Sequence, residues 1–133
     1  MLCALPTCAF AAGSIDLSRN GSVTISYQDE GKALSGVDFS IYLVATTDQY
    51  GRLTITKEFE NYNVNIGDQN NTTTWITLAS TLEGYVLRDK LNPIDTEKTG
   101  IDGIARFPSE NITFVPGLYL ITSSKHSQNG YSY

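Results

Sequence analysis

The stretch that decides the fold runs from Lys98 to Thr122 and reads KTGIDGIARFPSENITFVPGLYLIT. Asp102-Gly103 is a turn dipeptide, because glycine tolerates positive φ at no steric cost. Pro116-Gly117 predicts a second turn, since proline presets φ and glycine accepts the reversal of the chain. Around these turns, and most clearly in Leu118–Thr122, side chains alternate with a period of two. The stretch therefore predicts three strands joined by two turns.

The same alternation recurs earlier in the chain. It predicts strands at Ser22–Tyr27, Val37–Ala45 and Arg52–Thr56, with a turn at Asp29–Lys32. Along the second of these, five apolar residues share one face: Val37, Phe39, Ile41, Leu43 and Ala45. Residues 61–74 are rich in Asn, Asp and Thr and are expected to form a surface loop.

One segment has helical periodicity. Its apolar residues recur every three or four positions and predict a helix at about Trp75–Leu91, with an N-cap among Thr72–Thr74 and a stop at Asn92-Pro93. Gly84 inside it costs about 1 kcal/mol relative to Ala, which a close approach to the sheet would explain. Two aromatic residues of this helix, Trp75 and Tyr85, either pack on the sheet or line a ligand groove. The apolar stripe comprises Trp75, Leu78, Ala79, Leu82, Tyr85 and Val86.

Composition places the chain among folded, mainly β proteins. It has 133 residues, of which 41% are hydrophobic and 17% charged, so one domain with its own core is expected. The net charge of −5 and the lack of any Lys/Arg cluster disfavour nucleic acid as a partner. No stretch is long and apolar enough to span a membrane.

The N-terminus predicts export. Residues 1–12 read MLCALPTCAFAA, an uncharged apolar run with an A-x-A cleavage pattern at residues 9–11, and are interpreted as the remnant of a signal peptide. Cleavage after Ala11 would remove both cysteines, Cys3 and Cys8. The alternatives are a short N-terminal core strand and a lipidated Cys8, although Leu5-Pro6-Thr7 lacks the small residue expected before a lipid-bearing cysteine.

Catalytic and metal-binding patterns are missing from the sequence. His126 is the only histidine, and no Cys or His spacing supplies further metal ligands. Gly100–Gly103 is too short for a phosphate loop, and no serine sits on a nucleophile elbow. The carboxylates Asp29 and Glu30 fall in a turn, where solvent is expected around them. We therefore expect neither an enzyme nor a cofactor or metal.

Four stretches, in order, resemble the pilin and adhesin domains of Gram-positive surface proteins, of the collagen-adhesin B type with a prealbumin-like sandwich. Residues 31–42, GKALSGVDFSIY, look like the family's opening GKxLxGxxFxLY signature. Residues 99–107, TGIDGIARF, look like its TxxDGxAxF turn and strand. Residues 116–121, PGLYLI, look like its PGxYxL strand, and Gly130-Tyr131 looks like the GY that follows. The resemblance covers residues 22–133.

This resemblance implies an Ig-like or prealbumin-like β-sandwich with one inserted amphipathic helix, the insertion covering about residues 61–93. The domain would span residues 13–133 and be incomplete at its C-terminus, with a last strand beyond Tyr133. Family members often carry an isopeptide bond from a lysine on the first strand, promoted by a glutamate on a later one. Ser26 and Ser123 stand at those two positions, so we expect no such bond.

The function implied is that of a structural or adhesive domain at the bacterial cell surface or cell wall. Its partners would be other pilin or surface-protein domains, a host matrix protein or a glycan. The alternatives are a carbohydrate- or protein-binding module of a secreted enzyme and a transthyretin-like carrier of a small ligand, which would need an apolar pocket. The sequence names no ligand-binding residues.

Overall fold

The computed structural model describes residues 2–5, 15–66, 71–125, 127–128 and 131–132. Within these ranges the chain is mainly β and forms a β-sandwich with one helix, as predicted. The elements are β1 (Leu2–Leu5), β2 (Val23–Ser26), β3 (Gln28–Asp29), β4 (Lys32–Ala33), β5 (Asp38–Thr47), β6 (Leu53–Ile55), α1 (Thr72–Asp89), β7 (Asp95–Lys98), β8 (Ile104–Phe107), β9 (Gly117–Ser123), β10 (Ser127–Gln128) and β11 (Tyr131–Ser132).

The large sheet is built around β5. Its strand order is β1-β9-β5-β6, and β7 pairs with the first half of β5. All of these neighbours are antiparallel. β9 lies inside this sheet, with β5 on one side and β1 on the other side of Gly117–Leu120.

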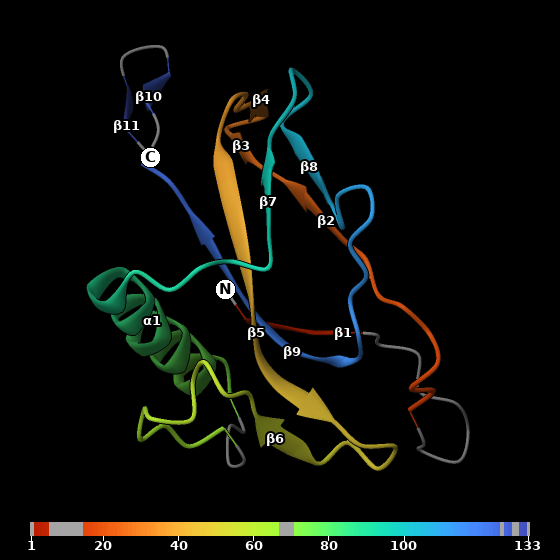
Figure 1. The fold of residues 1–133 in the computed structure, drawn as a ribbon. Coiled ribbons are helices and arrows are strands. Elements are labelled where there is room, and N and C mark those ends of the chain that lie inside the picture. Colours follow the sequence, from red (N-terminus) through yellow and green to blue (C-terminus); the bar gives the residue numbers. More distant parts are fainter. Residues whose placement is uncertain (1, 6–14, 67–70, 126, 129–130, 133) are drawn as a thin grey trace.

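Three layers stack in the order β2–β8, large sheet, α1 (Figure 1). The first layer is the antiparallel pair β2–β8, in which Val23 faces Phe107. One core lies between this pair and the large sheet and includes Ile25, Phe39 and Tyr119. A second core lies between the large sheet and α1 and includes Val44, Leu82 and Leu120. Two separate hydrophobic layers thus hold the domain together.

A bulge in β5 sends its last residues to a different layer. The register with β9 shifts between Leu43 and Ala45. Val37, Phe39 and Ile41 belong to the core under β2–β8, whereas Ala45 belongs to the core under α1. The prediction of one unbroken apolar face from residue 37 to residue 45 is therefore wrong at its end, because a bulge reverses the alternation of side chains.

The two turn glycines serve different purposes. Gly103 has φ +74°, as a turn glycine should, and a Cβ there would lie 2.6 Å from the carbonyl oxygen of Tyr27. Gly117 has no positive φ. A Cβ on Gly117 would lie 2.4 Å from the carbonyl oxygen of Ala45, so its role is to let β9 approach the bulge of β5. The turn interpretation of Gly117 was wrong, because close strand contact decides that position.

The helix is confirmed, with different ends. Its N-cap is Asn71, whose side chain accepts a hydrogen bond from the backbone N–H of Thr74 at 3.0 Å, in place of one of the three threonines. It ends at Lys90, which adopts the left-handed conformation with φ 52°. Leu78, Leu82 and Val86 are buried, along with Ala79. The predicted apolar stripe therefore faces the sheet through these four residues, whereas Tyr85 is not part of that core.

Residues 2–5 form β1, which pairs along four positions with β9. This arrangement corresponds to the alternative of a short N-terminal strand. Export and cleavage of residues 1–12 stay predictions, and residues 6–12 lie outside the described part of the chain. In the described residues, no helix is long and apolar enough to cross a membrane.

Buried Thr99 connects β7 to the loop before β5. Its hydroxyl accepts a hydrogen bond from the N–H of Val37 at 2.9 Å and donates one to the carbonyl of Leu34 at 2.7 Å. The side chain is only 3% exposed. Both main-chain groups therefore depend on this one hydroxyl, since buried polar groups need partners.

We predict that Thr99→Val lowers the free energy of unfolding by about 2 kcal/mol, because a buried donor and a buried acceptor both lose their partner. Urea denaturation monitored by circular dichroism measures the change. The control is Thr96→Val, at an exposed position of the same strand, where a change within about 0.5 kcal/mol is expected. Equal effects of the two substitutions would contradict the role of Thr99.

Gly84 does not approach the sheet. It is exposed, and a Cβ there would meet no atom within 4 Å. The close-approach explanation of this glycine is wrong.

We predict that Gly84→Ala raises the free energy of unfolding by about 0.5–1 kcal/mol, through better helix propensity and a more restricted unfolded state. Gly117→Ala should destabilise the fold, given the 2.4 Å contact. Loss of stability in Gly84→Ala, seen in the same urea titration, would be the contrary result.

Candidate functional site

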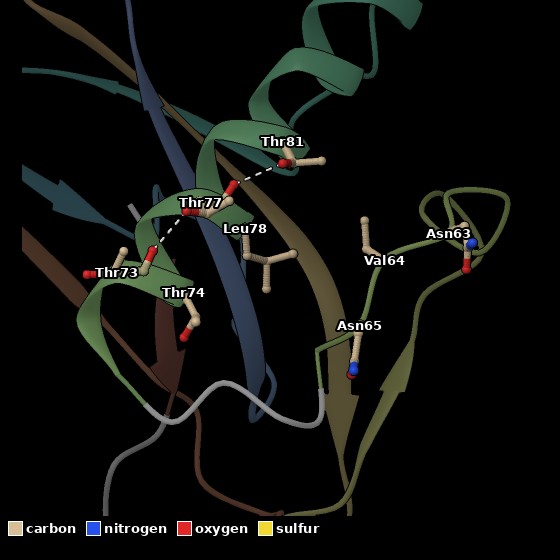
Figure 2. Close-up of a pocket in the computed structure, with 8 residues that line it drawn as sticks. All are labelled: Asn63, Val64, Asn65, Thr73, Thr74, Thr77, Leu78 and Thr81. Atoms are coloured by element: carbon tan, nitrogen blue, oxygen red, sulfur yellow. Dashed lines mark hydrogen bonds between the residues drawn. The ribbon is translucent and has the colours of Figure 1, made fainter.

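A groove runs between α1 and the segment that precedes it (Figure 2). Its volume is about 340 Å³. One wall comes from the first half of α1 and the other from residues 63–65, which lie before the helix and after β6. The lining residues are Thr73, Thr74, Thr77, Leu78 and Thr81 of α1, and Asn63, Val64 and Asn65.

The helix wall is a row of threonines. Thr73, Thr77 and Thr81 recur every four residues, so they share one face, and all three are exposed. The hydroxyl of Thr77 donates to the carbonyl of Thr73 at 3.0 Å, and that of Thr81 donates to the carbonyl of Thr77 at 2.9 Å (Figure 2). The protons of these two hydroxyls are engaged within the helix. A hydroxyl oxygen still has lone pairs, so this wall offers acceptors to a ligand's N–H or O–H groups.

The opposite wall alternates between exposed and buried side chains. Asn63 and Asn65 are exposed, while Val64 is half-buried and packs against the core under α1. Phe59 and Ile66, both buried, fix the two ends of the segment. The backbone turns between them, with the N–H of Val64 donating to the carbonyl of Tyr62 at 2.9 Å. This part of the predicted surface loop is thus held by the core and carries its two amides outward.

The base of the groove is apolar. Leu78 is 7% exposed and belongs to the same core as Val64. Figure 2 shows these two side chains on opposite sides of the groove, between the threonines and the asparagines. No lining residue carries a charge. The groove therefore suits a neutral ligand that combines hydrogen-bonding groups with an apolar patch.

A cluster of four side chains ties the 59–66 segment to the end of α1. The rings of Tyr62 and Tyr85 stack at 4.3 Å, and the Arg88 guanidinium lies 5.0 Å from the centre of the Tyr85 ring. The hydroxyl of Tyr62 donates to the Asp89 carboxylate, and Arg88 donates two hydrogen bonds to that carboxylate at 2.8 and 2.9 Å. The cluster therefore links the two elements that supply the walls of the groove.

The cluster also changes the acidity of its members. Hydrogen bonds from Arg88, and then from Tyr62, lower the pKa of the Asp89 carboxyl to about 2. The same hydrogen bond to Asp89 raises the pKa of the Tyr62 hydroxyl. The negative form of Asp89 is therefore the one that holds the two walls together, and it is kept over the whole ordinary pH range.

A second hollow lies on the other side of the 63–66 segment. Its volume is about 570 Å³, and it is lined by Gly51, Arg52, Leu53, Ile55, Val64, Asn65 and Ile66. Its charged side chain, Arg52, pairs with Asp48 at 2.6 Å. The 63–66 segment is therefore a ridge between two hollows, and the groove beside α1 is the one without a charged lining.

The candidate site residues singled out in the sequence, where the structure describes them, do not line this groove. Ser26 lies on β2, where its hydroxyl accepts a hydrogen bond from Gln28 at 3.2 Å, and Ser123 lies exposed at the end of β9 in the large sheet. The absence of an isopeptide bond stays a prediction. Of the helix aromatics, Trp75 packs against the core and Tyr85 stacks on Tyr62 beside the groove, without lining it.

His126 lies outside the described residues. Within the described ranges, no group of three His, Cys, Asp or Glu side chains could hold a metal ion. The threonine row was the signal that sequence reasoning missed, since its four-residue spacing was visible inside the predicted helix.

Comparisons with protein-family models, with curated proteins and with solved structures found no match to this chain.

We predict that Tyr62→Phe raises the pKa of Asp89 from about 2 part of the way to its usual 3.8, because one hydrogen bond to the carboxylate is lost while that of Arg88 stays. Since the folded-state pKa is depressed, the contribution of Asp89 to stability is complete above about pH 4 and is lost as the pH falls through about 2. In Tyr62→Phe the loss should start at the same pH, which the unfolded-state pKa sets, but it should be smaller and complete at a higher pH.

An NMR titration of the Asp89 carboxyl carbon measures this pKa. The matched control is Tyr85→Phe, which removes a hydroxyl from the other ring of the stack. An unchanged Asp89 pKa in Tyr62→Phe would show that the tyrosine does not hold the carboxylate.

Proposed function

We propose that this chain is a structural and adhesive domain of an exported bacterial cell-surface protein, of the pilin or wall-anchored adhesin kind. The observation that supports this proposal is the position of the three family-like stretches that the structure describes. They fall on the strands and turns that build the sandwich: residues 31–42 on β4 and β5, residues 99–107 on β8 and the turn before it, and residues 116–121 on β9.

Each stretch contains residues that this fold requires physically. Gly36 has φ +74° before β5, and Gly103 has φ +74° before β8. Thr99 supplies the buried hydroxyl between β7 and the loop before β5, and Gly117 lets β9 pack on the β5 bulge. The likeness therefore covers residues with a physical role in this sandwich, and this supports the proposed relation to the pilin and adhesin domains.

In this proposal the sandwich is the scaffold and the groove beside α1 is the adhesive surface. A neutral groove with hydroxyl and amide groups over an apolar base suits a glycan or a segment of another surface or matrix protein. The groove's lining contains no titratable side chain, so binding is the activity we assign, and not catalysis.

The second candidate is a binding module of a secreted enzyme. The same groove favours it, because hydroxyl and amide groups on a rigid support are common to both roles. The coding sequence that flanks these 133 residues discriminates between the two. A wall-sorting motif followed by an apolar tail supports the surface domain, and a catalytic domain supports the module.

The location of the protein is tested in the cells that produce it. Intact cells are treated with trypsin, and peptides released from the surface are identified by mass spectrometry. Peptides of this chain released from intact cells support the proposal. Recovery of the chain only after lysis would reject it.

We predict that Thr77→Glu weakens binding at the groove by at least about tenfold, because it adds bulk and charge to a neutral site. The binding partner is sought by screening the immobilised chain against neutral glycans and matrix proteins. The control is Thr24→Glu on β2 of the other sheet, an exposed position opposite Arg106, which should retain full binding. Equal binding by both variants would move the adhesive surface away from the groove.

A further inference from the structure

The two edges of β9 are filled very differently. One edge pairs with β5 along seven positions. The other pairs with β1 along four: Leu2 with Leu120, Cys3 with Tyr119, Ala4 with Leu118 and Leu5 with Gly117. The second partner comes from the opposite end of the sequence. One short segment therefore determines whether β9 is an internal strand or an edge strand.

The sequence of β9 is not that of an edge strand. Leu118, Tyr119, Leu120 and Ile121 are at most 4% exposed, with cores on both faces of the sheet. The strand, GLYLITS, contains neither a charge nor a proline. Proteins usually protect free edges with charged residues, prolines or very short strands.

The strands on the other side of the sheet have such protection. β7 reads DTEK and thus carries Asp95, Glu97 and Lys98. β6 is only three residues long. β9, by contrast, is seven residues long and carries neither a charge nor a proline, so its outer edge, where β1 lies, has no such protection. Its unprotected edge needs a partner strand.

Pairing at this edge depends on the main chain. Main-chain hydrogen bonds give affinity with little demand on sequence, so an extended segment from another molecule can replace an internal one. The chain's own segment has the advantage of being attached, which gives it an effective concentration on the order of a millimolar. Exchange between molecules should therefore appear at high protein concentration or when the attached segment cannot pair.

We propose that the outer edge of β9 is a strand-acceptor site that takes Leu2–Leu5 of a second copy in place of the chain's own Leu2–Leu5. The site recognises an extended apolar segment that runs antiparallel to β9. Such exchange is heterologous, since a segment of one copy meets a different surface of the next, and it links copies in series or closes a dimer. The proposal concerns chains that retain their first residues, and it does not rest on the proposed function.

The main experiment compares two variants of the full chain under reducing conditions. Cys3→Pro with Ala4→Pro removes N–H donors from β1 and disfavours its pairing. Cys3→Val with Ala4→Val keeps a strand-forming segment. The probe is a fluorescent peptide of residues 1–7 carrying Cys3→Val, and its binding is followed by anisotropy. A second peptide with the two prolines is the control probe.

We expect the valine peptide to bind the proline variant at least about tenfold more tightly than the valine variant, whose own segment fills the site. The proline peptide should bind neither. Equal binding of the valine peptide to both variants, no binding to the folded proline variant, or equal binding of the two peptides would each overturn the proposal.

Near-ultraviolet circular dichroism reports whether the proline variant folds. If it does not, light scattering of the valine variant decides alone. As its concentration approaches about 1 mM, where exchange competes with the attached segment, dimers or longer assemblies should form. A monomer at every concentration would reject the strand-acceptor site.

Discussion

The pairing of β5 with β9 is the interaction on which the rest of the domain depends. These are the two long strands of the large sheet, and they pair along seven positions. Side chains from both strands enter both cores: Ile41 and Tyr119 lie under the β2–β8 pair, and Val44 and Leu120 lie under α1. Neither outer layer can bury its apolar face without this pair, because a helix or a two-stranded ribbon alone is at best marginally stable.

The groove follows from the way that α1 covers the sheet. Its buried face, with Leu82 and Val86, fixes the helix on β5 and β9. Its threonine face is exposed and forms one wall of the groove. The 59–66 segment forms the opposite wall and is anchored by buried Phe59 and by the stack of Tyr62 on Tyr85. Binding surfaces are commonly built in this way, with polar groups placed on a rigid scaffold. The neutrality of the groove is a property of its lining residues and is independent of the net charge of the whole chain.

Local patterns predicted β2, β5, β6, β8, β9 and α1 well, because each of these elements has its period and its turn residues in one short stretch. Gly103 could be assigned to a turn for this reason. Contacts between distant residues escaped prediction. The bulge at Leu43–Ala45 and the close approach of Gly117 exist only once β5 and β9 are paired. The helix start at Asn71 was missed because three threonines offered the same capping chemistry, and only the backbone shows which residue caps.

The groove was harder still to foresee. Its threonines lie on the helix, but its asparagines come from a loop whose path depends on buried Phe59 and Ile66. The pairing of β1 with β9 joins the two ends of the sequence, and no local pattern encodes such a contact.

Native-state hydrogen exchange tests the central claim most directly, since it measures the free energy of opening at each amide. If the β5–β9 pair supports both cores, the slowest amides should be those of Ile41–Val44 and Leu118–Ile121, opening only by global unfolding. The amides of β2, β8 and α1 should exchange faster through partial opening. If β2 and β8 were instead as protected as β5 and β9, or if α1 were the most protected element, the central pair would not be what holds the layers together.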